Sequence, residues 1–464
     1  MKKVAFHNLG CKVNSYEMDA ISQMFQKQGY EIVEFAQKPD VIVINTCTVT
    51  NIADRKSRQM IHRAKAGNPD AVVVAVGCYV QTDLQGAMSD EAVDIAVGNN
   101  HKSEIVTIVE EYFHRTQEKD KCENIQDSKT LGGTTVSDLS KPVPYENLSI
   151  TCAGEHTRAF IKIQDGCNQF CSYCAIPLAR GRVRWRTEED ILDEVRILAE
   201  NGYKEVVLTG IHLSSYGLTD NYNQFAMHEN TNEALLKVIE EVAKVEKITR
   251  IRLGSLEPRL LTRKFVERLS GIDKLCPHFH LSLQSGCDEV LKRMNRHYSV
   301  KEFKEKVILL REYFEHPAVT TDVITGFPGE SEEEAEITAK YLEDINLYEC
   351  HIFKYSRRSG TVADKMKGQL TEKVKQERSK VLIEASDRRK REFMEYYVGK
   401  RVRVLVEDAE CIEENEYFTG LTPEYVKCAI VGGCTAEDKG REIDCIVTKI
   451  GKDVAVVKRA DLEF

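Results

Sequence analysis

The first part of the chain alternates short apolar runs with amphipathic stretches. Three of the apolar runs are predicted as strands, at residues 4–6, 40–45 and 71–76. Stretches with helical periodicity follow the first two, at residues 14–28 and 53–66. Runs rich in β-branched residues suit parallel strands that are buried on both faces. The alternation therefore predicts a doubly wound α/β domain over residues 1–115.

The same alternation returns after residue 155. Six apolar runs are predicted as strands, at residues 159–163, 205–208, 250–253, 278–283, 319–324 and 348–353. Thr187 and Ser331 each precede an acidic residue by three positions, which is typical of a capping box that opens a helix. Six βα units are too few for a closed eight-stranded barrel. We therefore predict an open, partial (β/α)6 barrel over residues 155–385.

From residue 397 the hydrophobic period changes to two. Five short segments alternate, at residues 401–406, 417–420, 425–431, 443–450 and 454–457, and predict a small β-barrel of oligonucleotide-binding type over residues 397–464. Residues 116–154 are polar and are predicted as a linker, and residues 386–396 as a connecting helix. Four cysteines of the last module match no paired-cysteine motif and are expected in its core: Cys411, Cys428, Cys434 and Cys445.

Length and composition narrow the class of protein. At roughly 150 residues per domain, 464 residues agree with about three domains. We find no apolar run long enough for a membrane span and no apolar signal region, and we expect a cytoplasmic protein. The net charge of −9 argues against a general nucleic-acid binder, so any such site must be a local patch. Fifteen cysteines in a reducing compartment indicate metal clusters rather than disulfides.

Three cysteines lie within eight residues of one another in the middle of the chain. Cys167, Cys171 and Cys174 form a C-x3-C-x2-C run. Zinc sites usually take four ligands from two separated pairs. Three thiolates in one tight loop favour a cubane iron–sulfur cluster that leaves one iron open to a small molecule. The alternative is a chance group of buried cysteines.

A second set of three cysteines is spread along the first domain. Cys11, Cys47 and Cys78 each follow one of the first three predicted strands. The carboxyl ends of parallel strands share one edge of a sheet, where ligands bind. These thiols are therefore expected to converge on a second cluster with an open iron. Three unrelated buried cysteines are the alternative reading.

The ends of the barrel strands carry glycines and polar side chains. Glycines let a backbone approach a ligand closely, and Glu257 and Gln284 are suited to accept hydrogen bonds from ribose hydroxyls or an amino group. Ordinary turns would look similar one at a time, but the shared location predicts cofactor contacts from Gly210, Glu257, Gln284, Ser285, Gly326 and Tyr355.

A basic strip follows the cysteine run. Arginines occupy alternate positions around the chain's single tryptophan. Such a strip suits phosphate contact and base stacking, although a solvated run of charge has the same composition. The residues predicted to contact RNA are Arg180, Arg182, Arg184, Trp185 and Arg186.

Nearly the whole chain resembles the radical S-adenosylmethionine (SAM) methylthiotransferases. The resemblance rests on the six cysteines, in matching order within the motifs at residues 9–14, 45–49, 76–79 and 165–174. It implies an auxiliary 4Fe–4S cluster on Cys11, Cys47 and Cys78 and a radical-SAM 4Fe–4S cluster on the other three. It also implies that the last module is an RNA-binding TRAM barrel.

The motifs at residues 9–14, 209–217 and 254–258 look most like the branch that acts on tRNA. That branch modifies N6-threonylcarbamoyladenosine, next to the anticodon, at its C2 carbon. Sister branches act on isopentenyladenosine in tRNA or on a ribosomal-protein aspartate. A non-catalytic iron–sulfur RNA-binding or electron-transfer protein is the alternative from another class. Trp185 departs from the family, which has a small polar residue there.

The resemblance also implies a mechanism. A first SAM on the open iron of the radical-SAM cluster yields a 5′-deoxyadenosyl radical, which takes hydrogen from C2. A methylated sulfur held at the open iron of the auxiliary cluster then bonds to that carbon, and a second SAM supplies its methyl group by ordinary displacement. The cofactors carry this chemistry, so we name no catalytic side chain. The implied partners are a tRNA, an electron donor and a sulfur donor.

Overall fold

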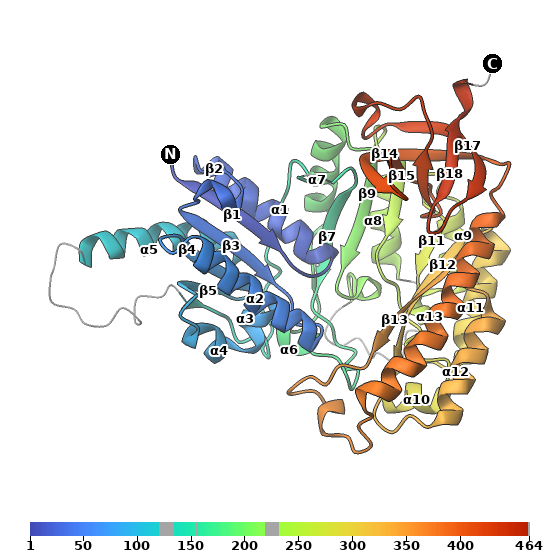
Figure 1. Cartoon of the computed structure of the whole chain (residues 1–464), viewed down its shortest axis with the longest axis horizontal. Helices are drawn as coiled ribbons and strands as arrows, with labels where there is room; N and C mark the ends of the chain where they lie inside the picture. The colour runs from blue at the N-terminus through green and yellow to red at the C-terminus, as the bar shows by residue number, and fades with distance from the viewer. Residues whose placement is uncertain (120–133, 155, 219–231, 463–464) are drawn as a thin grey trace. The chain divides into compact units, whose positions relative to one another are not determined.

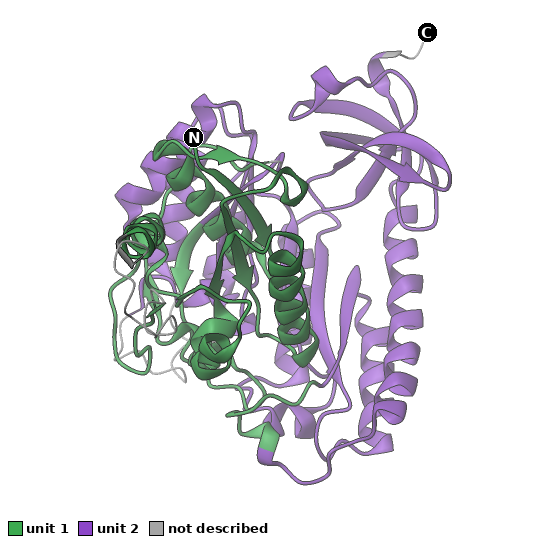
Figure 2. Ribbon diagram, turned by 60° about the vertical axis from the view of Figure 1, so that its left-hand side comes forward, with its two compact units in different colours: residues 1–154, 162–186, 356–364 green, residues 155–161, 187–355, 365–464 purple. Residues whose placement is uncertain are grey.

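The computed structural model describes residues 1–119, 134–154, 156–218 and 232–462. Two compact units are present (Figure 2). The first comprises residues 1–154, 162–186 and 356–364, and the second comprises residues 155–161, 187–355 and 365–464. The cysteine run at residues 167–174 thus groups with the N-terminal sheet, whereas the predicted domain division had placed it with the barrel.

A six-stranded sheet forms the centre of the first unit, with β1, β3 and β4 side by side (Figure 1). Its order is β2-β1-β3-β4-β5-β6, and every pair is parallel. The strands are β1 (Lys3–Asn8), β2 (Glu31–Ile32), β3 (Val41–Thr46), β4 (Val72–Gly77), β5 (Ile95–Val97) and β6 (Thr134–Thr135).

Helices cover both faces of this sheet. Alternate residues of β3 enter opposite cores: Val41 and Val43 on one side, Ile42 and Ile44 on the other. The first core includes residues of α1 (Lys12–Lys27) and α5 (Ile105–Lys119). The second includes residues of α2 (Asn51–Gly67), α3 (Cys78–Thr82) and α4 (Leu84–Ser89). The predicted doubly wound arrangement is confirmed.

The segment that was predicted as a linker packs on this sheet. Its strand β6 pairs with β5, and Leu139, Leu148 and Ile150 are buried. The Tyr16 hydroxyl donates to the Leu148 carbonyl at 2.5 Å. These few apolar side chains, dispersed among polar ones, are enough to fix the segment. Residues 120–133 of the predicted linker lie outside the described part of the chain.

Six strands with their helices form a partial barrel, as predicted. The strands are β7 (Ala159–Asp165), β9 (Glu205–Gly210), β10 (Arg250–Leu253), β11 (His278–His280), β12 (Ala318–Thr325) and β13 (Glu349–Lys354). They run in the orders β10-β9-β7 and β11-β12-β13, and parallel bridges at Ile251–Leu275 and Leu256–Leu281 join the two sets. Strand β7 begins in the second unit and ends in the first, where it pairs with β8 (Arg184–Trp185).

The helices of the second unit begin where the sequence indicates. The hydroxyls of Thr187, Ser331 and Thr371 each accept a hydrogen bond from the backbone N–H three residues on, which satisfies a group at the helix terminus. The helices are α7 (Glu188–Glu200), α8 (Glu233–Ala243), α9 (Arg263–Ser270), α10 (Asp288–Arg293), α11 (Val300–Tyr313), α12 (Glu332–Ile345) and α13 (Glu372–Glu395).

The last module is a closed five-stranded barrel of the order β14-β15-β16-β18-β17, drawn in red in Figure 1. Pairing is antiparallel except between β16 and β18, as in oligonucleotide-binding barrels. Cys428 and Cys445 are buried in its core, as predicted, but Cys411 is exposed and Cys434 is half-buried. The strands are β14 (Arg401–Ile412), β15 (Asn415–Leu421), β16 (Lys427–Ile430), β17 (Glu442–Ile450) and β18 (Ala455–Arg459).

Two buried arginines of β10 attach the barrel to the rest of the second unit. Arg250 donates to the carbonyls of Leu421 and Arg403, at 2.8 and 2.9 Å. Arg252 donates to the Pro423 carbonyl at 2.9 Å. The fully buried carboxylate of Glu205 neutralises Arg252, with 2.7 Å between Oε1 and Nε.

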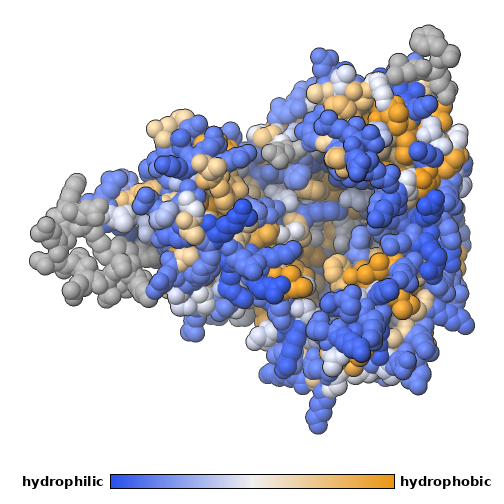
Figure 3. Space-filling view, in the orientation of Figure 1, coloured by the Kyte–Doolittle hydropathy of each residue, from blue (hydrophilic) through white to orange (hydrophobic). Residues whose placement is uncertain are grey.

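The face of the molecule seen in Figure 3 is mostly hydrophilic. Within the described residues, no helix is long and apolar enough to cross a membrane.

Glu205→Gln should destabilise the second unit. The substitution leaves Arg252 buried without its counter-charge, so we expect the free energy of unfolding to fall by about 3 kcal/mol. Asp444→Asn, in the exposed pair with Arg401, is the control and should cost less than about 1 kcal/mol. Urea unfolding followed by circular dichroism measures both, and an equal, small effect of the two variants would contradict the prediction.

Candidate functional site

Cys11, Cys47 and Cys78 lie at the carboxyl ends of three adjacent parallel strands. Cys11 is the N-cap residue of α1, shortly after β1; Cys47 directly follows β3; Cys78 is the first residue of α3, directly after β4. Strand β3 pairs with β1 on one side and β4 on the other. The predicted convergence at one sheet edge is therefore confirmed, although no ligand assignment follows from that alone.

The turn before Cys11 packs directly against Cys47. Gly10 has φ +124°, and a Cβ there would lie 2.7 Å from Asn14 Nδ2 and 3.3 Å from Cys47 Cβ. Burial raises the pKa of the Cys47 thiol to about 11, and the charges of Cys78 and Cys11 add to that rise. None of the three cysteines forms a disulfide bond.

Cys11 is exposed by surface area, yet the surrounding protein desolvates its sulfur. Desolvation raises the pKa of this thiol, and the Arg180 guanidinium is the largest opposing influence. The Asn14 amide oxygen accepts a hydrogen bond from Arg180 Nη2 at 2.7 Å and lies 3.7 Å from Cys11 Sγ.

The cysteine loop is held by its own backbone. Cys167 N–H donates to the Gly181 carbonyl at 3.0 Å, and Val183 N–H donates to Asn168 Oδ1 at 3.2 Å. Gly166 has φ +71°, and a Cβ there would lie 1.9 Å from the Arg182 carbonyl oxygen. A glycine is therefore required at this position for the loop to close. Cys167, Cys171 and Cys174 form no disulfide bond, and their side chains are partly exposed.

The two sets of cysteines belong to the same compact unit. Helix α6 (Ile176–Arg180), which directly follows the cysteine loop, contacts α3, whose first residue is Cys78. One side chain connects them: Asn99 Nδ2 donates to Cys78 Sγ at 3.4 Å and to the Ala179 carbonyl at 2.7 Å.

A segment after β13 joins both loops. Arg358 Nη1 donates to Asn51 Oδ1 at 2.8 Å and to Asp54 Oδ2 at 2.6 Å, and its Nη2 donates to the Thr48 hydroxyl. Ala363 N–H donates to the Ser172 carbonyl at 2.7 Å. Residues 356–364 thus contact residues that follow Cys47 and the residue that follows Cys171. We did not predict this role, because a basic turn after a strand carries no distinctive pattern.

The predicted basic strip is wrong for three of its five residues. Arg180, Arg184 and Arg186 are 0, 6 and 3% exposed, and all three are hydrogen-bonded within the protein. The physical reason is that this segment lies against the protein interior, where Arg180 and Arg184 pair with the buried carboxylates of Glu17 and Asp165 and Arg186 donates to the Tyr16 hydroxyl. Arg182 is exposed and Trp185 is half-exposed, so these two remain candidates for RNA contact.

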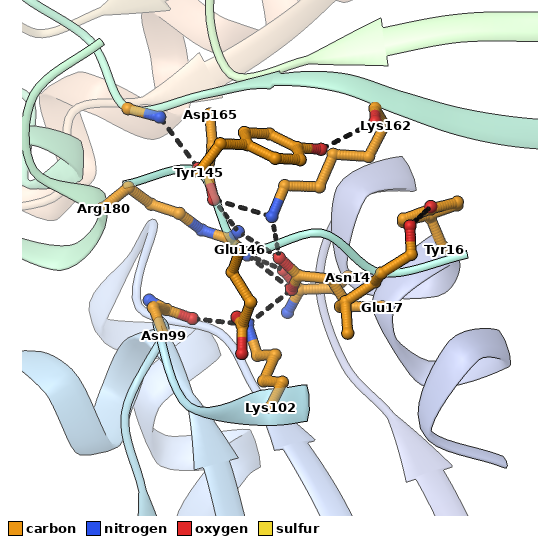
Figure 4. Close-up of polar contacts among 12 residues, drawn as sticks. Asn14, Tyr16, Glu17, Asn99, Lys102, Tyr145, Glu146, Lys162, Asp165 and Arg180 are labelled. Atoms are coloured by element: carbon orange, nitrogen blue, oxygen red, sulfur yellow. Dashed lines mark hydrogen bonds and ion pairs between the residues drawn. The ribbon is translucent and has the colours of Figure 1, made fainter. Parts of the chain in front are cut away.

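Six of the residues that the structure buries form a charge network, shown in part in Figure 4. Glu17 is its centre and pairs with Lys102 at 2.6 Å, Lys162 at 2.7 Å and Arg180 at 2.6 Å. We call the whole set the buried charge network: Glu17, Lys102, Lys162, Asp165, Arg180 and Arg184. A lysine at position 162, inside an otherwise apolar strand, was the sequence signal for it.

Interactions within the network shift the pKa values of its members. Burial opposes ionisation of Glu17, but Arg180, Lys102 and Lys162 outweigh it and hold the pKa of Glu17 well below its usual range. Burial lowers the pKa of Lys102; Glu17 counteracts this, while Arg180 and Lys162 lower it further. Positive charge is therefore in excess around Lys102.

The predicted cofactor contacts lie at the strand ends of the second unit, in differing environments. Gly326 has φ +72°, and its N–H donates to Glu330 Oε1 at 3.0 Å. Gln284 also has a positive φ, +71°. The Ser285 hydroxyl is buried, accepts from Cys287 N–H at 3.2 Å and lies 3.3 Å from the Thr338 hydroxyl. The Ser285 hydroxyl is thus hydrogen-bonded inside the protein, and its contact with a cofactor stays a prediction.

Two more of these residues are also buried. Glu257 pairs with Arg259 at 2.8 Å and Arg296 at 3.6 Å; although burial opposes it, these cations and His212 lower the pKa of Glu257. The Tyr355 ring is buried against Phe327, with 5.5 Å between centroids. Gly210, which ends β9, is half-exposed. For Gly210, Glu257, Gln284, Gly326 and Tyr355, cofactor contact stays a prediction.

Three polar side chains of the barrel strands were missed. His280, Asp322 and His351 come from β11, β12 and β13 and lie close together, with 3.4 Å between His280 Nε2 and Asp322 Oδ2. Asp322 is directly opposite His351 in the strand register. We had interpreted these segments as apolar runs, which hid the polar positions that alternate within them.

The C-terminal barrel carries a groove with basic side chains. Tyr417, Lys427, Lys449, Lys452 and Lys458 are among the residues that line it. Aromatic and cationic side chains in a groove of such a barrel suit single-stranded nucleic acid, although the module as a whole is acidic.

The donor sets fit iron–sulfur clusters. Each set offers three cysteines that form no disulfide bond, and thiolates are the usual ligands of 4Fe–4S clusters. The cysteines of the first set lie at the carboxyl ends of three adjacent strands, and those of the second lie within one closed loop.

Gly166→Ala should prevent the binding of one iron–sulfur cluster. The added Cβ collides with the Arg182 carbonyl and opens the loop, so we expect iron after anaerobic reconstitution to fall from about eight to about four per chain. Gly202, with φ +94° and open space around it, provides the control: Gly202→Ala adds the same backbone strain without a collision. Iron analysis that gave equal content for both variants would contradict this account.

Comparisons with known proteins agree with this arrangement. The radical SAM superfamily matches residues 161–342, and the family described as uncharacterized protein family UPF0004 matches residues 3–98. The solved radical S-adenosylmethionine methyltransferase TsrM from Kitasatospora setae superimposes with a TM-score of 0.52 and 14% identity, over 78% of this chain and 77% of that chain. At this identity the likeness concerns the fold.

Curated relatives are more similar in sequence. The threonylcarbamoyladenosine tRNA methylthiotransferases MtaB of Bacillus subtilis and Aquifex aeolicus are each 40% identical, over 97% and 90% of this chain and 95% and 94% of their own lengths. A tRNA-2-methylthio-N(6)-dimethylallyladenosine synthase of Clostridium botulinum is 34% identical over 89% of this chain and 86% of its own length. The chain therefore belongs to the radical SAM superfamily and, within it, to the methylthiotransferase family.

Proposed function

We propose that the protein is a tRNA methylthiotransferase that converts N6-threonylcarbamoyladenosine, next to the anticodon, into its 2-methylthio derivative. One structural observation carries the reaction class. Two sets of three cysteines, none of them in a disulfide bond, belong to one compact unit, and the helix that begins with Cys78 contacts the helix that follows Cys174. Two cluster sites held so firmly by one unit suit a reaction in which one centre makes a radical and the other supplies sulfur.

The cysteines take different roles in this proposal. Cys167, Cys171 and Cys174 hold the radical-SAM cluster, and Cys11, Cys47 and Cys78 hold the auxiliary cluster. When bound, these groups supply the one-electron cleavage of SAM and the sulfur that is transferred. The chain itself fixes the thiols: the Gly181 carbonyl and Asn168 close the first loop, and Asn14 and Asn99 contact Cys11 and Cys78.

Two surfaces are assigned to the tRNA. The groove of the C-terminal barrel offers Tyr417 and four lysines. Arg182 and Trp185 offer a cation and a stacking surface beside the cysteine loop. These local patches reconcile an RNA substrate with the net charge of −9.

The substrate assignment rests on the relatives. Those named for threonylcarbamoyladenosine include the two that are 40% identical, whereas the Clostridium botulinum relative named for dimethylallyladenosine is 34% identical. Isopentenyladenosine in tRNA is therefore the second candidate, with the same chemistry. A ribosomal-protein aspartate is less well supported, because these relatives are all named for tRNA.

Mass spectrometry of tRNA nucleosides decides among these substrates. We expect 2-methylthio-N6-threonylcarbamoyladenosine to vanish from a strain that lacks the gene and to return when the gene is supplied on a plasmid. The isopentenyladenosine derivative, in the same digests, serves as the internal control and should not change. Loss of that derivative instead would overturn the substrate assignment.

Replacing Cys11, Cys47 and Cys78 by alanine should separate the two halves of the reaction. The radical-SAM loop is unchanged in this variant, so we expect the reconstituted protein to form 5′-deoxyadenosine from SAM and dithionite but no methylthio product. Cys411→Ala, at an exposed cysteine of the barrel, is the control and should retain both activities.

Two outcomes would contradict this assignment. Equal loss of both activities in the triple variant would mean that the three cysteines are structural. Absence of 5′-deoxyadenosine in the wild-type protein would favour a non-catalytic iron–sulfur protein.

A further inference from the structure

The buried charge network holds more positive than negative charge. Its members contribute four cationic groups and two carboxylates, an excess of two positive charges when all are ionised. Glu17, Lys102, Lys162 and Arg180 are each at most 1% exposed. Burying uncompensated charge is costly, so the protein must place negative charge near this network when it works.

Two asparagines connect the network to the auxiliary cysteines. Arg180 Nη2 donates to Asn14 Oδ1 at 2.7 Å, and that oxygen lies 3.7 Å from Cys11 Sγ. Lys102 Nζ donates to Asn99 Oδ1 at 2.7 Å, and Asn99 Nδ2 donates to Cys78 Sγ at 3.4 Å. Each of two auxiliary thiols is thus one side chain away from a buried cation. Figure 4 shows the two asparagines beside Lys102 and Arg180.

One hydrogen-bond donor of Arg180 has no partner among the described residues. Its two terminal nitrogens are bonded to Glu17, Asn14 and Asp165, but in the described part of the chain its buried Nε–H has no hydrogen-bond partner. A buried donor without a partner is costly, and an anionic ligand close by would relieve that cost.

We propose that the buried charge network, and Arg180 above all, is the counter-charge of the auxiliary cluster and tunes its redox potential. The inference rests on the proposed cluster at Cys11, Cys47 and Cys78. A 4Fe–4S cluster on three thiolates carries net negative charge, and more of it when reduced. A fixed cation in a low-dielectric interior therefore favours the reduced form. Arg180 acts through the field and through Asn14, so it is a positioning residue rather than a catalytic one.

The test is a redox titration of the auxiliary cluster, monitored by electron paramagnetic resonance. The full-length chain carries Cys167→Ala, Cys171→Ala and Cys174→Ala, so that only the auxiliary site is loaded, and no tRNA or SAM is added. Arg180→Gln removes the charge, and Arg180→Lys keeps it with a different shape. Lys102→Met removes the charge of another cation of the network, the one that is linked to Cys78 through Asn99.

Removal of either charge should make the cluster harder to reduce. At the midpoint potential of the parent chain, we expect the ratio of reduced to oxidised cluster to fall at least tenfold in Arg180→Gln, a shift of about 59 mV for a one-electron couple. Lys102→Met should shift the ratio in the same direction, and Arg180→Lys should stay within about threefold of the parent.

Arg252→Gln is the matched control. Arg252 is equally buried and also pairs with a glutamate, but it belongs to the second unit. The proposal is overturned if Arg180→Gln and Lys102→Met behave like Arg252→Gln, or if Arg180→Lys shifts the potential as far as Arg180→Gln. Because no tRNA is present, the titration is independent of the substrate assignment, and a chain that binds no iron at Cys11, Cys47 and Cys78 would refute the proposed cluster instead.

Discussion

The carboxylate of Glu17 is the interaction on which the first unit depends. It lies on α1 and pairs with Lys102, which precedes α5, with Lys162 on β7 and with Arg180 at the end of α6. These partners are 85, 145 and 163 positions away in the chain. A single buried anion thus fixes the N-terminal sheet to the strand and helix that flank the radical-SAM loop. Without it, Lys102 would be left buried without a counter-charge, and Lys162 and Arg180 would have only the carboxylate of Asp165.

Much of the site follows from that arrangement. Because β7 and α6 are held to α1, the loop with Cys167, Cys171 and Cys174 belongs to the same unit as Cys11, Cys47 and Cys78. Chemistry that passes from one centre to another needs fixed geometry, and buried ionic contacts provide it.

The positions of the six cysteines as cluster ligands can be predicted from the sequence, because their spacing and their places after predicted strands follow general rules. Strand periodicity locates the ends of β1, β3 and β4, and parallel strands must end at one edge. The prediction of RNA contact fails for Arg180, Arg184 and Arg186. Arginines at alternate positions give the same sequence pattern on a solvated strip and in a segment that lies against buried carboxylates. The neutralising Glu17 is 163 positions from Arg180, beyond the reach of local patterns. The segment at residues 116–154 was wrongly predicted as a linker because its few apolar residues show no periodicity. Cys411 was wrongly predicted as buried because alternation does not indicate which end of a strand is covered by the core.

Anomalous scattering at the iron edge, from crystals of the anaerobically reconstituted chain, tests the central claim most directly. The account predicts two separate iron centres in each chain, one bound by Cys11, Cys47 and Cys78 and one by Cys167, Cys171 and Cys174. Iron at the loop alone, or a disulfide or zinc ion at the first set, would contradict it.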